Sequence, residues 1–185
     1  SPLPAEREIA LVVEAAFLRA SGQTAPTKSE ALARVEADAS LSDSVRADAL
    51  HRVRNLRRNS IELSQAIWPI LRQPGQPKET YQRARLYVEE LLSLDPAKRV
   101  SWSARAQVHY RLGHFPEALA DMARITELHT AQQFPLPAED LTILAMAQHQ
   151  TGRLDEARAT LDRVPAAASR NELEWQKLLA EAESL

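Results

Sequence analysis

The chain has 185 residues, 44% of them hydrophobic, a formal net charge of −2 at pH 7 and no cysteine. This composition suffices for a substantial apolar core, but it excludes disulfides, thiolate metal ligands and a cysteine nucleophile. The small net charge also provides no long-range field that would draw the whole molecule to nucleic acid or to an anionic membrane.

Alanine and leucine dominate the sequence, and no segment alternates β-branched and polar residues, so we expect an all-α fold. The most apolar run, IALVVEAAFL at residues 9–18, is too short to span a bilayer and contains Glu14. We therefore expect neither a signal peptide nor membrane insertion, and we expect a cytoplasmic location. The first residue is Ser1 rather than Met, which suggests a piece of a longer protein.

Three helices are predicted near the start of the chain. Thr27 precedes Glu30 by three residues, the spacing of a capping box at a helix start. Ser42 is in a position to cap the helix that follows. We expect these helices at about residues 5–20, 27–39 and 42–57.

A cluster of helix-breaking residues follows the third predicted helix. Pro69, Pro74, Gly75 and Pro77 cannot all lie inside one regular helix, so we expect a loop of about eight residues there. Pro96 ends the helix that comes after this loop. The later helices are expected at about residues 99–112, 116–130, 137–151, 154–164 and 170–184.

The segment HYRLGHFPEALADM, which begins at His109, is nearly repeated 39 residues later as QHQTGRLDEARATL. In this alignment Gly113 corresponds to Gly152, and Ala118 corresponds to Ala157. Glycine is favoured where a helix ends in a left-handed residue, and alanine is favoured where two helices cross closely. The sequence therefore predicts two copies of one helical hairpin.

This pattern resembles the tetratricopeptide repeat, an antiparallel helix pair of about 34 residues. The matching residues are Trp102, Ala106, Gly113, Phe115, Ala118 and Leu128 in one copy, and Leu144, Ala145, Gly152, Leu154, Ala157, Leu161 and Val164 in the next. Arg105 and His109 depart from the pattern, because leucine and an aromatic residue are usual there. Trp102, Phe115 and Leu154 are expected to fill the space between successive hairpins.

The resemblance implies a short, right-handed α-solenoid of stacked antiparallel hairpins with flanking helices. The order of segments also resembles the carboxy-terminal repeat region of large bacterial multidomain proteins, in which a Ser/Thr kinase domain or a β-propeller of the WD40 type often lies upstream. The expected divisions are N-terminal flanking helices at 1–58, repeats at 59–168 (a degenerate copy at about 59–96, then 99–132 and 137–167) and a C-terminal capping helix at 169–185.

The capping helix is expected to begin with a capping box of Ser169 and Glu172. Its apolar side is predicted to carry Trp175, Leu178, Leu179 and Ala182. Its solvated side is predicted to carry Glu174, Lys177 and Glu181. This distribution is typical of a helix that closes a repeat array and keeps its end soluble.

The resemblance implies a scaffold that binds a protein or peptide partner in a concave groove lined by the first helix of each pair. The exposed groove residues are expected to be Ser103, Gln107, Tyr110, Arg111, Thr142, Met146, His149 and Gln150. Arg111 can bind a carboxylate, and Tyr110 and Met146 offer adaptable apolar contact. The Lys/Asn set with which some family members clamp a terminal carboxylate is missing at Ser103 and Gln107. Two alternatives stay open for this predicted groove: it is ordinary solvated surface, or the first three helices cover it.

Catalytic patterns are missing from the sequence. The five histidines form no HExxH motif, no GxSxG elbow occurs, and the four glycines are scattered singly. We therefore expect no enzymatic activity, no metal, no cofactor and no small-molecule substrate.

The basic run HRVRNLRRN offers an alternative function, a nucleic-acid contact surface through Arg52–Arg58. Its cations are Arg52, Arg54, Arg57 and Arg58. Val53 and Leu56 interrupt the run at core spacing, and cations also stabilise the end of a helix, so a structural role is favoured. Binding that falls steeply with salt would support the nucleic-acid alternative.

Overall fold

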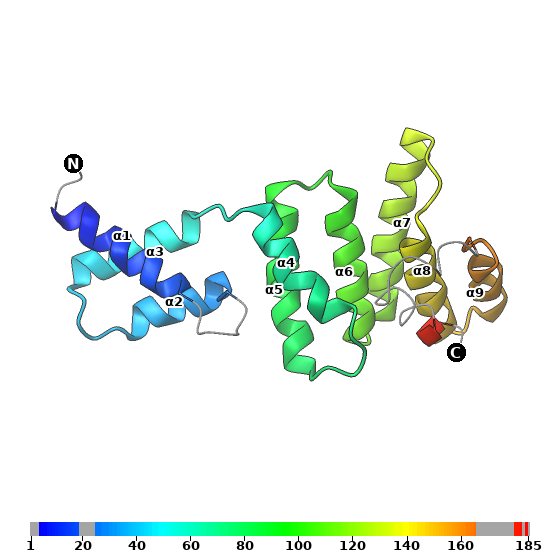
Figure 1. The fold of residues 1–185 in the computed structure, drawn as a ribbon, viewed down its shortest axis with the longest axis horizontal. Helices are drawn as coiled ribbons and strands as arrows, with labels where there is room; N and C mark the ends of the chain where they lie inside the picture. The colour runs from blue at the N-terminus through cyan, green and yellow to red at the C-terminus, as the bar shows by residue number, and fades with distance from the viewer. Residues whose placement is uncertain (1–3, 19–24, 166–179, 183, 185) are drawn as a thin grey trace. The chain divides into compact units, whose positions relative to one another are not determined.

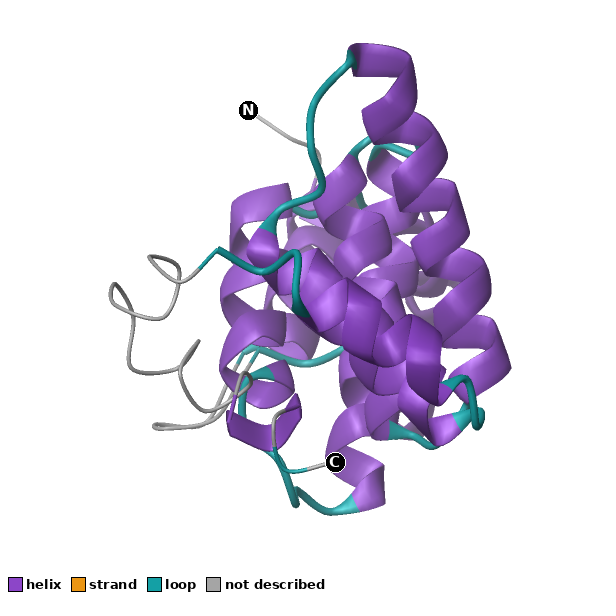
Figure 2. Ribbon diagram, turned by 90° about the vertical axis from the view of Figure 1, so that its right-hand side faces the viewer, coloured by secondary structure: helices purple, strands orange, loops and turns teal. Residues whose placement is uncertain are grey.

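The computed structural model describes residues 4–18, 25–165, 180–182 and 184. Within this part of the chain the regular structure consists of nine α-helices, without any strand (Figures 1 and 2). The all-α prediction is therefore confirmed. The chain divides into two compact units, residues 1–59 and 60–185, and each has its own helices and core.

The first unit contains α1 (Pro4–Phe17), α2 (Lys28–Ala37) and α3 (Asp43–Asn55), each in contact with the other two. Their shared core consists of Ile9, Ala16, Ala31, Val35, Val45, Ala49 and Val53. The predicted capping box is present. The Glu30 amide donates to Thr27 Oγ1 at 3.2 Å, and the Thr27 amide donates to the Glu30 carboxylate at 2.7 Å. Ser42 caps α3, also as predicted.

The second unit stacks three helix pairs (Figure 1). The pairs are α4 (Ser60–Leu71) with α5 (Lys78–Leu94), α6 (Arg99–Arg111) with α7 (Phe115–Gln132), and α8 (Ala138–Gln150) with α9 (Leu154–Leu161). The first helices of the pairs also contact one another, α4 with α6 and α6 with α8. This arrangement confirms the helical-repeat fold that the sequence predicts.

The turns of the second and third pairs use the two aligned glycines in the same way. Gly113 has φ of +79°, and the next amide, of His114, donates to the His109 carbonyl at 2.8 Å. Gly152 has φ of +78° and is followed by an equivalent bond of 2.9 Å. A Cβ atom at either glycine would meet nothing within 4 Å. Glycine is therefore needed here for its left-handed backbone and not for space.

The two aligned alanines are buried, as their place in the pattern predicts: Ala118 is 0% exposed and Ala157 is 4% exposed. Trp102 and Phe115 are partly buried. Trp102 packs against both core clusters of the second unit, and Phe115 packs against the cluster formed by α6, α7 and α8. Leu154 differs from the prediction, because it is 55% exposed. It opens α9, and in the described part of the chain no later hairpin stacks on that helix.

The loop between α4 and α5 is shorter than predicted. Pro69 lies inside α4, and the loop covers only residues 72–77. A proline within a helix removes a single amide donor, and here it lies near the last turn with its side chain exposed. The helix continues past it, because the Arg72 amide still donates to the Trp68 carbonyl at 3.2 Å.

The predicted capping helix is described only at residues 180–182 and 184, and residues 180–182 form a helical turn. The other residues of that prediction lie outside the described part of the chain; they are Ser169, Glu172, Glu174, Trp175, Lys177, Leu178 and Leu179. Within the turn, Ala182 is buried, as its predicted side requires. Glu181 does not lie on a solvated face, because it is bound by Arg111.

Candidate functional site

The eight residues predicted to line an exposed groove all lie on α6 and α8, but most are buried. The buried ones are Ser103, Gln107, Tyr110, Thr142 and Met146. Arg111 and His149 are partly buried, and Gln150 is exposed. The predicted exposure was therefore wrong for most of this set. The physical reason is that α6 contacts α4, α5, α7 and α8 at once, which leaves none of its residues fully exposed.

The hydroxyl groups of two of these residues are bonded inside the protein. Ser103 Oγ donates to one carboxylate oxygen of Asp140 at 2.5 Å, and Arg99 Nη1 donates to the other at 2.6 Å. Asp140 is completely buried, so these bonds tie α6 to α8. Thr142 Oγ1 donates within its own helix to the Ala138 carbonyl at 2.9 Å. Ser103 and Thr142 are therefore engaged inside the protein.

The sequence carries a weak signal for the Asp140 contact. Arg99 lies in the first turn of α6, where a cation is unfavourable to the helix dipole and needs an acidic partner. Which acid it meets is decided by the stacking of the repeats, because the two residues are 41 positions apart.

The two departures from the repeat pattern, Arg105 and His109, meet at one buried carboxylate on α7. Arg105 donates from Nε and Nη2 to Asp121, and His109 Nδ1 lies 3.1 Å from Asp121 Oδ2. Burial alone would raise the pKa of Asp121, but the hydrogen bonds and charges of His109 and Arg105 lower it below its usual value. The guanidinium also stacks over Trp102, 4.3 Å from the ring centroid. At these two positions, polar contacts with Asp121 therefore tie α6 to α7.

The end of α6 forms a third polar centre, around Arg111. Its side chain is only 4% exposed. Arg111 Nε donates to the Leu71 carbonyl at the end of α4 at 3.1 Å. Arg111 Nη1 donates to both carboxylate oxygens of Glu181, at 2.6 and 2.7 Å. The guanidinium therefore links α4, α6 and the C-terminal turn.

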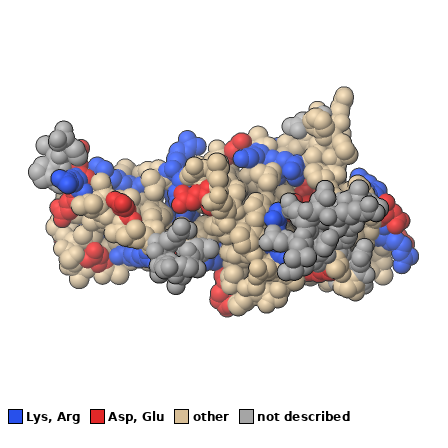
Figure 3. All heavy atoms as spheres, in the orientation of Figure 1, with Lys and Arg blue, Asp and Glu red and all other residues tan. Residues whose placement is uncertain are grey.

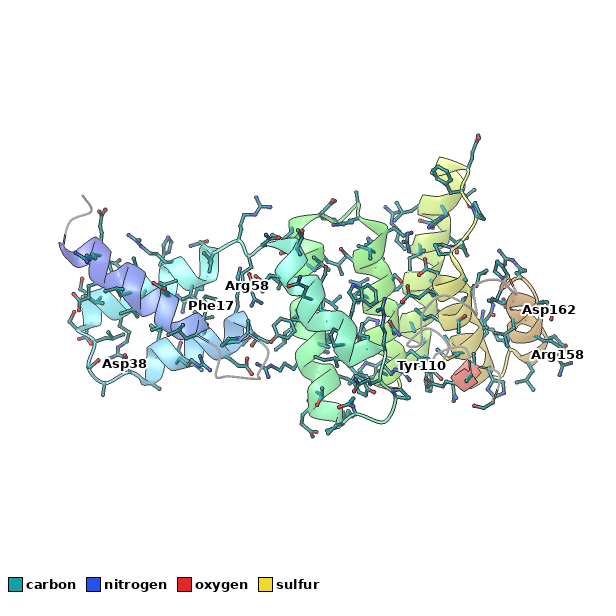
Figure 4. All side chains as sticks on the ribbon, viewed as in Figure 1. Phe17, Asp38, Arg58, Tyr110, Arg158 and Asp162 are labelled. Atoms are coloured by element: carbon teal, nitrogen blue, oxygen red, sulfur yellow. The ribbon has the colours of Figure 1, made fainter. Side chains whose placement is uncertain are left out.

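An apolar contact accompanies this ion pair. Ala182, 4% exposed, belongs to one buried cluster with residues of α6 and α8 that include Ala106, Tyr110, Met146 and Ala147. We call Ala106, Tyr110, Arg111, Met146 and Ala147 the Arg111 site. Figure 1 shows the C-terminal turn in red near α8, and Figure 4 labels Tyr110.

The charges of the site act on the Tyr110 hydroxyl. Burial raises the pKa of Tyr110, and the Glu181 carboxylate raises it further. Arg111 and a hydrogen bond with Gln150 act in the opposite direction and are smaller in effect. The structure thus brings Tyr110, Arg111 and Gln150 of the predicted set into one electrostatic environment with Glu181, a residue that sequence reasoning placed in solvent.

Two polar atoms on the side chains that reach the Leu71 carbonyl are buried without a hydrogen-bond partner in the described part of the chain. They are Arg111 Nη2 and Gln107 Oε1. Gln107 Nε2 lies 3.4 Å from the same Leu71 carbonyl that Arg111 binds, so both side chains converge on the end of α4.

The basic run of the first unit is divided by burial. Arg58 is 9% exposed, donates to the Pro26 carbonyl at 2.7 Å and lies over the Phe17 ring at 5.5 Å (Figure 4). Val53 is completely buried, as its spacing predicts, whereas the prediction was wrong for Leu56, which is 37% exposed. The exposed cations of the run are Arg52, Arg54 and Arg57. On the face drawn in Figure 3, basic and acidic side chains are interspersed over the described surface. These observations favour the structural reading of the run.

The residues that the structure describes contain no group of three or more His, Cys, Asp or Glu side chains that could hold a metal ion. In the same described segments, no helix is long and apolar enough to cross a membrane.

Comparison with known families agrees with the stacked helix pairs. Residues 100–120 and residues 128–182 match the tetratricopeptide repeat family. These two segments of the chain are therefore similar to tetratricopeptide repeats. No curated protein and no solved structure matches the chain. Tetratricopeptide repeats are generally protein–protein interaction modules and are typically non-catalytic scaffolds. The longer match extends to Ala182, so it includes the turn that contacts the Arg111 site.

Proposed function

We propose that residues 60–185 form a non-catalytic scaffold that binds a peptide or a helix of a partner protein over α6 and α8, at the Arg111 site. The tetratricopeptide repeat matches support the general role of a protein-interaction module. The position of the binding face rests on the side chains of the site itself.

The arginine at the centre of the site is the observation that carries this proposal. A guanidinium that is 4% exposed is costly to bury unless an anion compensates its charge. The Leu71 carbonyl fixes its orientation but supplies no negative charge. Glu181 supplies that charge in the structure, so the group that Arg111 accepts is a carboxylate. The adjacent Tyr110 and Met146 belong to the apolar cluster that the C-terminal turn covers. Arginine and tyrosine surrounded by apolar residues are typical of the energetically dominant part of a protein interface.

The predicted contact set changes with the burial of its members. Tyr110, Arg111, Met146, His149 and Gln150 remain our proposed partner contacts. Ser103 and Thr142 are removed from it, because their hydroxyl groups are bonded inside the protein. Gln107 remains beside the site through its contact with Leu71.

The test is to capture a partner with the tagged full chain and to repeat the measurement with Tyr110→Ala combined with Arg111→Ala. We expect the affinity to fall by about tenfold or more, because a buried charged contact and an aromatic contact are both lost. His149→Ala with Gln150→Ala is a milder pair that spares the core.

The matched control is Glu117→Ala with Arg124→Ala, which changes exposed residues of α7. It should bind the partner as the wild type does. Undiminished binding by a Tyr110/Arg111 double variant that keeps its helical circular dichroism would place the interface elsewhere.

The wider setting remains a prediction from the sequence alone. We propose that this module is part of a larger bacterial protein and is cytoplasmic, on the resemblance of its segment order to such proteins. The complete reading frame in the source genome, together with fractionation of the native protein, tests both statements.

A further inference from the structure

The Arg111 site is filled by the chain's own C-terminal turn, which shows what kind of ligand the site accepts. Glu181 supplies the carboxylate, and Ala182 supplies a small apolar side chain that is 4% exposed. We propose that this turn imitates the partner, and that the partner binds by displacing it with a helical turn that carries glutamate followed by a small residue. This inference rests on the proposed function, because it specifies the ligand of the same site.

The chemistry of both ligand positions follows from what the turn contacts. The first position faces Arg111, whose buried guanidinium requires a negative charge. The second position is held by Ala182, which is itself 4% exposed in a cluster with Met146 and Ala147, so a larger side chain is expected to overpack it. The site therefore discriminates against partners that lack the acid and against those with a bulky next residue.

The internal turn does not use all that the site offers, which explains how a partner can compete with it. Among the described residues, Glu181 accepts hydrogen bonds from Arg111 Nη1, while Arg111 Nη2 is buried without a hydrogen-bond partner. A carboxylate that accepts from both Nη1 and Nη2 makes the stronger, forked arrangement. A partner with this geometry gains contacts that the internal turn lacks.

The internal turn has its own advantage, because it belongs to the same chain and has a high effective concentration at the site. The apparent affinity for any external ligand is therefore the affinity of the open site multiplied by the fraction of molecules in which the site is open. The turn therefore keeps partners that bind the open site only weakly from occupying it.

The probe for this inference is a fluorescein-labelled synthetic peptide with the sequence of residues 169–185, SRNELEWQKLLAEAESL. Its binding is measured by anisotropy to the full-length wild type and to a full-length Glu181→Gln/Ala182→Asp variant. The variant removes the internal carboxylate and places a charge in the apolar cluster, so its site is open. We expect about tenfold tighter peptide binding by the variant than by the wild type.

Three controls isolate the site. Adding Arg111→Ala to the open variant should abolish the gain, and a peptide with its own Glu181→Gln change should bind about tenfold more weakly. The matched control variant, Glu127→Gln with Ala123→Asp, makes the same chemical changes on the exposed surface of α7 and should bind as the wild type does.

Equal peptide affinity for the wild type and the open variant, both helical by circular dichroism, overturns the inference. If the double change unfolds the chain, Glu181→Gln alone is used, and an unchanged affinity then overturns it equally. A wild type that is dimeric and an open variant that is monomeric also overturn it, because the turn then fills the site of a second copy. If the peptide fails while a captured partner still requires Arg111, the inference is wrong and the proposed function stands.

Discussion

Three carboxylates set the electrostatics of the second unit: Asp121 and Asp140 are buried, and Glu181 is partly buried. Asp121 is bound by Arg105 and His109. Asp140 is bound by Arg99 and Ser103. Glu181 is bound by Arg111. In each case the acid and its basic partner lie on different helices, so each ion pair fixes the position of one segment against another. Removing only one member leaves a buried charge unpaired, which costs more than the pair contributes.

Asp121 allows a test by pH. Its pKa is lowered in the folded protein, so it stabilises the fold above its unfolded value of about 3.9, and this contribution is lost as the pH falls through the lower folded value. Asp121→Asn removes that contribution. We expect the variant to be less stable than the wild type at neutral pH, with a difference that narrows below about pH 4. Urea midpoints between neutral and acidic pH measure this, and parallel profiles for the two proteins would contradict it.

At this scale, features that depend on nearby residues were predictable from the sequence, whereas contacts between distant residues were not. Thr27 with Glu30, and Gly113, act over a few residues, and the structure confirms both. Arg111 and Glu181 are 70 positions apart, and nothing in either neighbourhood points to the other. Their contact depends on how the chain returns to α6, which one sequence without aligned relatives does not reveal.

Close helix crossings determine the helix pairs, and the aligned alanines mark them. Ala118 and Ala157 are 0% and 4% exposed, whereas Glu117 beside Ala118 is exposed. Ala118→Leu or Ala157→Leu should lower the free energy of unfolding by about 1–3 kcal/mol, because the extra methyl and methylene groups overpack the crossing. Glu117→Leu should have almost no effect. Chemical denaturation of the three variants measures this, and equal midpoints would show that the alanines do not lie at tight crossings.

Helix positions followed from apolar periodicity, caps and glycines, but exposure along a helix did not. In a repeat array the pattern of one pair indicates which face meets its own partner helix. It does not indicate how many further neighbours that face meets. Since α6 contacts four other helices, residues such as Ser103 and Gln107 became internal although their polarity suggested solvent. Pro69 shows a similar limit, because one missing amide did not end α4.

At the scale of the whole molecule, the fold prediction depended on the repeated sequence pattern. Two copies of a Gly/Ala pattern were sufficient to predict stacked helix pairs, and the tetratricopeptide repeat matches over 100–120 and 128–182 agree with that prediction. The candidate site was only half predictable. Its residues on α6 and α8 were named from the repeat pattern, whereas the chain segment that occupies it was not foreseen. The longer repeat match includes this segment, but its place at the site was identified only by its contacts with Arg111 and the α6–α8 cluster.

The Arg111–Glu181 ion pair is the contact on which the ligand chemistry of the site depends, and a double-mutant cycle measures it. The free energy of unfolding is determined for the wild type, Arg111→Ala, Glu181→Gln and the double variant. The cycle cancels the separate loss of the Leu71 bond, so the remainder reports the pair itself. We expect a coupling of about 1–3 kcal/mol, since the Arg111 side chain is 4% exposed and both carboxylate oxygens are bound. Single-variant effects that add to within about 0.3 kcal/mol would show that Glu181 does not occupy the site.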